Sequence, residues 1–167
     1  MDLPLMKSRA CLALAEETET ARRSLYALLP RFPREALTDG NTETEDNPRG
    51  ILCHVTFATF SYGCWIRRVR GHLDPGVEKE EKAAFLARVR SLTRAAGFEE
   101  ASDWASTYYY ETLARVEPDE LEREFQANWG STMGVELMME HALVHLLRHR
   151  RQLEILLGDR PQLATRE

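Results

Sequence analysis

Three of the five histidines in this chain fall within nine residues, at a spacing that could bind a metal ion. His141, His145 and His149 are separated by four residues each. On a helix, a step of four advances by about 40°, so the three imidazoles share one face. His141 and His149 would lie about 12 Å apart along the axis, too far to hold one ion together. The spacing therefore favours one adjacent pair, either His141 with His145 or His145 with His149, completed by a ligand from another segment.

His54 is the natural third ligand, because it lies in a second segment with helical character. Three nitrogen ligands that leave a position open are typical of catalytic metal centres rather than of closed structural ones. Such a centre lowers the pKa of a bound water or thiol and prepares it to attack an electrophile. The alternative is that these histidines are ordinary surface residues or hydrogen-bonded core residues. His72, which follows Gly71 directly, is predicted to be a turn residue.

The residues that follow His54 at helical spacing could form a pocket beside it. Ala58, Ser61 and Trp65 come at i+4, i+7 and i+11, close to the azimuth of His54. They offer a small side chain, a hydroxyl and a large ring as pocket walls. The alternative is that Ala58 and Trp65 simply pack in the core.

The same predicted helix has a basic end, formed by Arg67, Arg68 and Arg70. These arginines either bind an anionic substrate or balance the partial negative charge at the carboxyl end of a helix. The sequence leaves both interpretations open.

The positions of helix formers, caps and breakers predict four long helices and no strands. Asn47-Pro48 begins the second helix, because asparagine caps a first turn and proline is tolerated there. Gly71 and Gly158 are placed to end the second and the last helix. The predicted helices cover residues 5–29, 48–70, 77–116 with a break at Gly97, and a last segment from a cap at Ser131 or Thr132 to Leu157. This pattern predicts an all-α protein and favours a four-helix bundle.

Two connecting segments carry no long helical pattern. Residues 35–47 hold several acids and no base, and we predict a mobile, solvated loop, with a binding role as the alternative. Residues 119–130 are ambiguous, and a short helix is predicted over 120–125.

The composition bounds the class of protein. The 167 residues, with a net charge of −5, indicate one domain over residues 1–167 and argue against a nucleic-acid binder. No apolar run reaches the ~20 residues of a membrane-spanning helix, and the amino terminus is unlike a signal peptide. Cys11, Cys53 and Cys64 lack the spacing of a disulfide framework or a zinc ribbon, and the last two are predicted to be buried apolar residues. We therefore expect a reduced, cytoplasmic protein.

Two segments of the sequence resemble the DinB-like (YfiT-like) family of metalloenzymes. Residues 54–66, which follow Asn47-Pro48, resemble the second helix of the family. Residues 141–153, HALVHLLRHRRQL, resemble its last helix, where the usual pattern is H-x-x-x-H-x-x-x-H-R-G-Q-[IL]. The chain departs from this pattern at Arg151, where the family commonly has glycine. This departure lies just beyond the histidines and leaves the metal-binding positions intact.

The resemblance implies a metal site made of His54, His145 and His149, with His141 supporting or lining it. It also implies a four-helix bundle of DinB/YfiT-like topology, with helices in non-sequential order, that is often a homodimer. The expected ion is a divalent transition metal, zinc or nickel, since imidazole suits both. Some relatives use low-molecular-weight thiols, so a small-molecule substrate with such a thiol is the expected partner, and neither nucleic acid nor a membrane is expected.

Two classes of function follow from these observations. The first is a metal-dependent enzyme, such as a thiol-dependent transferase or hydrolase, in which Ser61 or Trp65 shapes the pocket and Glu111 or Glu140 is a candidate general base. The second is a non-catalytic metal-binding or structural bundle that acts through dimerisation, with the ion tying two helices together. A bis-histidine haem bundle is a third alternative.

Overall fold

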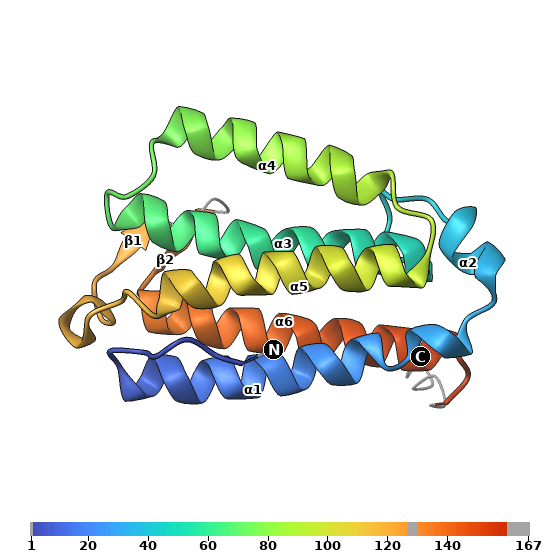
Figure 1. Cartoon of the computed structure of the whole chain (residues 1–167), viewed down its shortest axis with the longest axis horizontal. Coiled ribbons are helices and arrows are strands. Elements are labelled where there is room, and N and C mark those ends of the chain that lie inside the picture. The colour runs from blue at the N-terminus through green and yellow to red at the C-terminus, as the bar shows by residue number, and fades with distance from the viewer. Residues whose placement is uncertain (1, 127–129, 160–167) are drawn as a thin grey trace, which may run out of the picture.

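The computed structural model describes residues 2–126 and 130–159, and helices dominate it (Figure 1). The long helices are α1 (Arg9–Tyr26), α3 (Pro48–Val69), α4 (Pro75–Arg90), α5 (Ala95–Leu113) and α6 (Val135–Leu156). The short elements are the helix α2 (Arg34–Thr38), the 3₁₀ turns at Leu29–Arg31 and Pro118–Glu120, and an antiparallel pair of strands, β1 (Phe125–Gln126) and β2 (Thr132–Met133). The prediction of a mainly helical protein is confirmed, whereas the short pair of strands and the fifth long helix differ from it.

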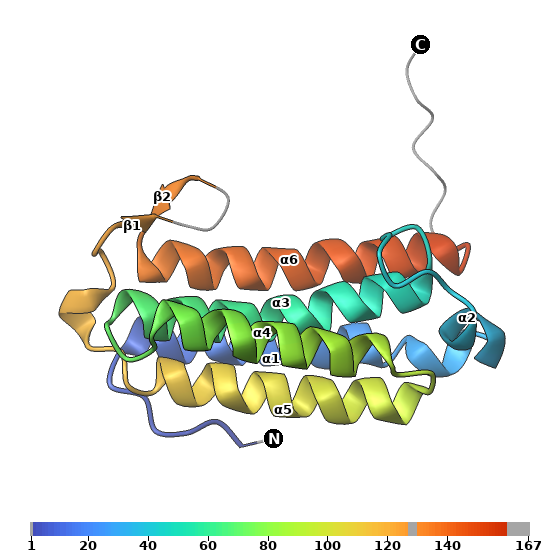
Figure 2. The ribbon, with the colours of Figure 1, turned by 90° about the horizontal axis from the view of Figure 1, so that it is seen from above.

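Helices α1, α3, α5 and α6 lie side by side, and α4 packs against the outer side of α3 (Figures 1 and 2). Helix α1 contacts α6 and α5, and α3 contacts the same two helices. The colour gradient shows that α1 and α6 run in one direction, and that α3 and α5 run in the other (Figure 1). Helices α3 and α6, which carry the predicted ligands, are therefore antiparallel neighbours.

The ends of α3 follow the predicted signals. The Asn47 side chain accepts a hydrogen bond from the Gly50 amide at 2.9 Å, and Pro48 occupies the first turn. At the other end, Gly71 has a φ of 74°, which allows the left-handed turn that ends the helix. The helix that carries His54 therefore has the predicted bounds.

The helical region predicted over residues 77–116 is broken into two helices, as expected, but the break comes earlier than Gly97. Helix α4 ends at Arg90, and α5 begins at Ala95, so Gly97 lies inside α5 rather than at the break. The Ser91 hydroxyl donates to the Arg88 carbonyl at 2.6 Å, a local bond that competes with helix continuation. Glycine in a helix costs only about 1 kcal/mol, which packing can outweigh.

The segment around residues 119–134 also differs from the prediction. A 3₁₀ turn takes the place of the short helix over 120–125. Thr132, one of the two predicted helix caps, belongs to β2 and pairs with β1. Helix α6 therefore begins three residues after Thr132, at Val135. The first helix likewise begins later than predicted, at Arg9, where the Ser8 hydroxyl accepts from the Cys11 amide.

The acidic segment before α3 is held in place, although a mobile loop is predicted there. Helix α2 covers part of it, and the Arg49 guanidinium donates to the carbonyl oxygens of Thr38 and Gly40 at 2.7 and 3.2 Å. Gly50 packs so closely that a Cβ atom would lie 1.7 Å from the Thr44 carbonyl oxygen. The segment is thus fixed against the first turn of α3.

The three cysteines are buried and free, and the predicted burial of Cys53 and Cys64 is confirmed. Burial raises the thiol pKa of Cys53 and of Cys64 to about 11, so both thiols stay protonated and unreactive. Both side chains therefore pack as small apolar residues. Among the described residues, none of the helices has the length and apolar character needed to cross a membrane.

Candidate metal centre

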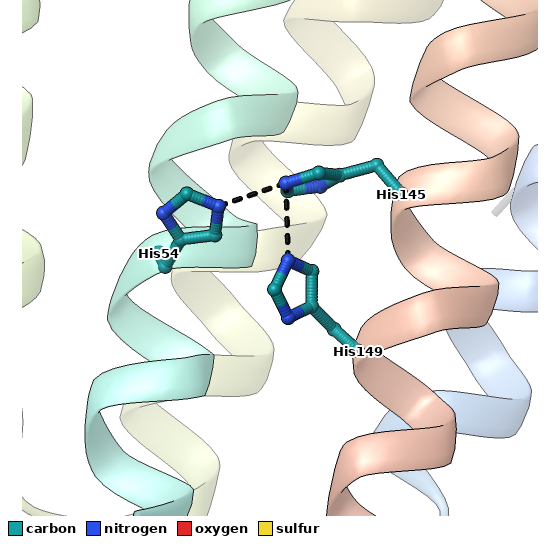
Figure 3. A group of neighbouring side chains, drawn as sticks. All are labelled: His54, His145 and His149. Carbon is teal, nitrogen blue, oxygen red and sulfur yellow. Dashed lines mark hydrogen bonds between the residues drawn. The ribbon is translucent and has the colours of Figure 1, made fainter. Parts of the chain in front are cut away.

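His54 on α3 and His145 and His149 on α6 point toward one another across the antiparallel helix pair (Figure 3). The Nε2 atom of His145 lies 2.8 Å from that of His54 and 3.1 Å from that of His149. One nitrogen from each ring lies within 4.8 Å of those of the other two. Two histidines four residues apart on α6 and one histidine on α3 therefore place three imidazole nitrogens close together.

The histidine cluster lies at the boundary between the core and solvent. His149 is 1% exposed, and His54 and His145 are partly buried. Burial, reinforced by the neighbouring imidazoles, lowers the pKa of His145 to about 2. Burial also lowers the pKa of His149 to about 4 and shifts that of His54 downward. All three rings are neutral at physiological pH, which is the form that binds a metal.

Two side chains lie near the Nδ1 atoms of His54 and His149, on the side of each ring away from the cluster. The Gln152 amide oxygen accepts a hydrogen bond from Nδ1 of His149 at 2.5 Å. The Glu45 carboxylate lies 3.3 Å from Nδ1 of His54 and 3.9 Å from Nδ1 of His149. Acceptors near Nδ1 favour the tautomer with the proton on Nδ1 in both neutral rings, and this tautomer has its lone pair on Nε2.

This arrangement leaves an electrostatic conflict that a cation removes. The lone pairs of His54 and His149 both face Nε2 of His145, which has at most one proton to share. Because the pKa values of His145 and His149 are lowered, these rings take up no further proton at neutral pH. A metal with bonds of about 2.0–2.1 Å to nitrogen needs its ligands about 3.0–3.4 Å apart. Two of the three nitrogen pairs lie at 2.8 and 3.1 Å, and all three nitrogens lie within 4.8 Å of one another, so the donor set could hold a transition-metal ion once the rings adjust.

His141 and His72 lie outside the cluster. His141 is exposed one turn before His145, with ring centroids 6.0 Å apart, and its ring meets the edge of Tyr62 at 5.6 Å. His72 follows the glycine turn at the far end of α3. The structure thus groups the His145–His149 pair with His54, where the spacing alone allowed either pair.

A cavity of about 210 Å³ lies beside His54, and its walls are not those predicted. It is lined by residues 42–45, Gly50, Cys53, His54, Phe57, Leu86 and Arg90. Trp65 instead packs near the hairpin, where its indole donates to the Gln126 carbonyl at 3.3 Å. Trp65 is buried in the core, which is the alternative that the sequence left open, and the acidic segment and α4 line the cavity beside His54 instead.

Sequence reasoning missed Glu45 as a site residue. Glu111 and Glu140, the predicted candidates for a general base, line other cavities, whereas Glu45 is in contact with two of the three histidines. The sequence signal for Glu45 is the acidic run directly before the cap of the His54 helix, a pattern that also predicts a solvated loop.

The fold and the cluster define a class: a helical protein in which three histidines from two neighbouring helices could hold a metal ion. The chain belongs to the DinB family, whose family model matches residues 6–159 and so spans all three histidines. The predicted family resemblance is confirmed. Comparison with curated proteins and with solved structures gives no match.

Proposed function

We propose that His54, His145 and His149 bind a divalent transition-metal ion, and that the protein is a metal-dependent enzyme acting on a small molecule. The observation that carries this proposal is the convergence of three neutral imidazole nitrogens on one point. The proposed class is a thiol-dependent transferase or a hydrolase. Bound there, the ion would supply Lewis acidity that lowers the pKa of a water or thiol.

The residues around the histidines have supporting roles in this proposal. Gln152 and Glu45 hold the rings so that their Nε2 atoms face the ion. The cavity beside His54, at about 210 Å³, receives the reacting part of a small substrate. Cys53 lines this cavity, but its pKa of about 11 keeps the thiol protonated. A thiol nucleophile would therefore come from a low-molecular-weight cosubstrate.

Several finer features belong to the proposal. Zinc and nickel are both candidate ions, because both accept imidazole ligands. The helices α1, α3, α5 and α6 would form a four-helix bundle of the DinB/YfiT type. We also propose that the protein is a cytoplasmic homodimer.

A second candidate function is structural. The three histidines join α3 to α6, and His149 is buried, so a bound ion would tie these helices together. In that case, metal would contribute stability without any turnover.

Elemental analysis combined with an activity panel tests the enzyme proposal. The purified protein is expected to hold about one transition-metal ion per chain and to consume thiol in the presence of epoxides, activated alkenes or aryl halides, or to hydrolyse ester and amide substrates. His145→Ala is expected to lose both metal and activity. His141→Ala, one turn away on the same helix and outside the cluster, is the matched control and should retain both.

The outcomes separate the two functions. Metal-dependent turnover that disappears in a folded His145→Ala variant supports the enzyme. Metal binding with no turnover on any substrate, together with a large loss of melting temperature in His145→Ala, favours the structural role. Absence of metal after purification and reconstitution contradicts both.

A further inference from the structure

The three arginines at the end of α3 have different partners. Arg68 pairs with Glu78 at 2.6 Å, and Arg70 pairs with Glu120 at 2.9 Å. Arg67 instead donates to the Tyr108 hydroxyl at 2.6 Å, and its guanidinium carbon lies 5.3 Å from the centroid of that ring. Among the described residues, no carboxylate lies within ion-pair distance of Arg67. One of the three charges is therefore held in place without an acid to neutralise it.

Arg67 faces a cavity of about 420 Å³ between the ends of α3 and α5. Its lining includes His72, then Tyr108 and Glu111 from α5, and Arg115, which lies just after the end of α5. This end of the molecule lies at the left of Figure 1, where α3 is green. His54 is thirteen residues earlier on the same helix, or about 20 Å along its axis. The cavity is thus separate from the histidine cluster.

Local backbone structure places these groups around the cavity. The His72 amide donates to the Arg67 carbonyl at 2.8 Å, and the Gly71 amide donates to the Arg68 carbonyl at 2.9 Å. These two bonds form a Schellman motif, which turns the chain so that His72 lies back beside Arg67. On the other side, the Tyr108 ring lies so close to Gly63 that a Cβ there would meet it at 2.9 Å. The hydroxyl that orients Arg67 is therefore fixed by packing.

The charge of this cavity is opposite to that of the chain. Arg67 and Arg115 make no ion pair with any described residue, and Glu111 is the one carboxylate among the lining residues. The lining is positive even with His72 neutral, whereas the whole chain has a net charge of −5. A planar guanidinium with free N–H groups pairs well with a carboxylate or a phosphate.

We propose that this cavity binds the anionic group, a carboxylate or a phosphate, of a small molecule, with Arg67 and Arg115 as the pairing residues. The cavity volume is in the range of small-molecule sites. The site is independent of the proposed metal centre, and it accounts for the arginine whose charge the fold leaves unpaired.

Isothermal titration calorimetry of the intact protein with inorganic phosphate, and separately with succinate, tests this proposal. Saturable binding of at least one anion to one site per chain is expected, and the stronger of the two identifies the anionic group. Arg67→Gln is expected to weaken binding by about ten-fold or more, since it removes a charge-assisted pair. Arg115→Gln, which changes an exposed side chain and leaves the Tyr108 contact intact, should also weaken it.

Two controls assign the binding to this cavity. Arg94→Gln removes the same charge from an exposed position at the other end of α5 and should leave the affinity unchanged. His145→Ala should also leave it unchanged, because the histidine cluster is remote. The proposal is overturned if neither anion binds saturably, if Arg94→Gln weakens binding as much as Arg115→Gln, or if His145→Ala abolishes it.

Discussion

At the scale of single residues, the acceptors at Nδ1 decide what the histidines can do. Glu45 and Gln152 direct the lone pairs of two rings toward the third, and burial keeps all three rings neutral. A carboxylate behind a ligating imidazole also increases the basicity of the ring. Glu45 would therefore strengthen the proposed metal binding without touching the ion.

Glu45→Gln is expected to weaken metal binding by about ten-fold or more. The amide keeps the shape of the side chain but removes the negative charge near Nδ1 of His54 and His149. Competition with a chromophoric chelator measures the affinity. Glu43→Gln is the matched control, because Glu43 lies in the same segment and pairs with Arg90 instead. Equal affinities for both variants and the wild type would show that Glu45 has no such role.

At the scale of elements, the segment before α3 delivers Glu45 to the cluster. Its path depends on Gly50, where the backbone of residues 41 and 44 passes too close for any side chain. Arg49 fixes the other end of the segment, because its guanidinium donates to backbone carbonyls of the segment, of the last residue of α4 and of the α4–α5 link.

Gly50→Ala is expected to reduce stability by about 1–3 kcal/mol, because the added Cβ would overlap the Thr44 and Asn41 carbonyl oxygens at 1.7 and 2.6 Å. It should also weaken metal binding, since Glu45 would be displaced. Urea unfolding and the chelator assay measure the two effects. Gly97→Ala should be neutral or stabilising, because Gly97 lies inside α5, where alanine is the better helix former. The added Cβ would meet only the flexible end of the Leu92 side chain. A fully stable Gly50→Ala variant would contradict the close packing.

A second link between elements joins α1 to α5 through the buried Glu19. Burial alone would raise the pKa of Glu19, but bonds from Arg22 and Arg23 outweigh it and hold the pKa at about 2. The Tyr110 hydroxyl on α5 donates to the same carboxylate at 3.2 Å. Glu19 therefore stabilises the fold in its charged form.

Stability is expected to fall as the pH drops from about 4.5 toward 2, because the unfolded state takes up a proton before the folded state does. The loss from Glu19 amounts to roughly 3 kcal/mol. Thermal unfolding of the wild type and of Glu19→Gln across this range measures it. The variant should be less stable at neutral pH and should show a shallower decline in acid. Parallel curves for the two proteins would contradict a role for this carboxylate.

At the scale of the whole molecule, the histidines join two helices that are distant in sequence. Helices α3 and α6 are neighbours because α1 and α5 complete the packing on their other sides (Figure 2). A ligand that binds only the folded arrangement stabilises it. The metal centre is thus expected to couple to global unfolding.

Added zinc or nickel is expected to stabilise the metal-free protein by about 2.7 kcal/mol at one hundred times the dissociation constant. Differential scanning calorimetry measures the shift in melting temperature. The shift should vanish in His54→Ala and persist in His141→Ala, since only the former belongs to the cluster. An equal shift in both variants would indicate metal binding elsewhere.

The sequence predicted the helices with strong local signals and the histidines with helical spacing. Asn47-Pro48 and Gly71 bound α3 as predicted, because caps and breakers act within a few residues. The break at residues 91–94 and the fixed acidic segment depend on contacts with distant backbone, such as those of Arg49. Glu45 could not be predicted as a site residue because its contacts also depend on residues distant in sequence. Only the folded chain brings its carboxylate beside two imidazoles.

The central claim is that His54, His145 and His149 hold one metal ion, and anomalous diffraction tests it most directly. Crystals of protein loaded with zinc or nickel would be measured on both sides of the absorption edge of the metal. We expect one anomalous peak per chain, about 2.1 Å from Nε2 of each of the three histidines. The absence of a peak at this cluster, or a peak bound by His141 with His145 instead, would contradict the claim.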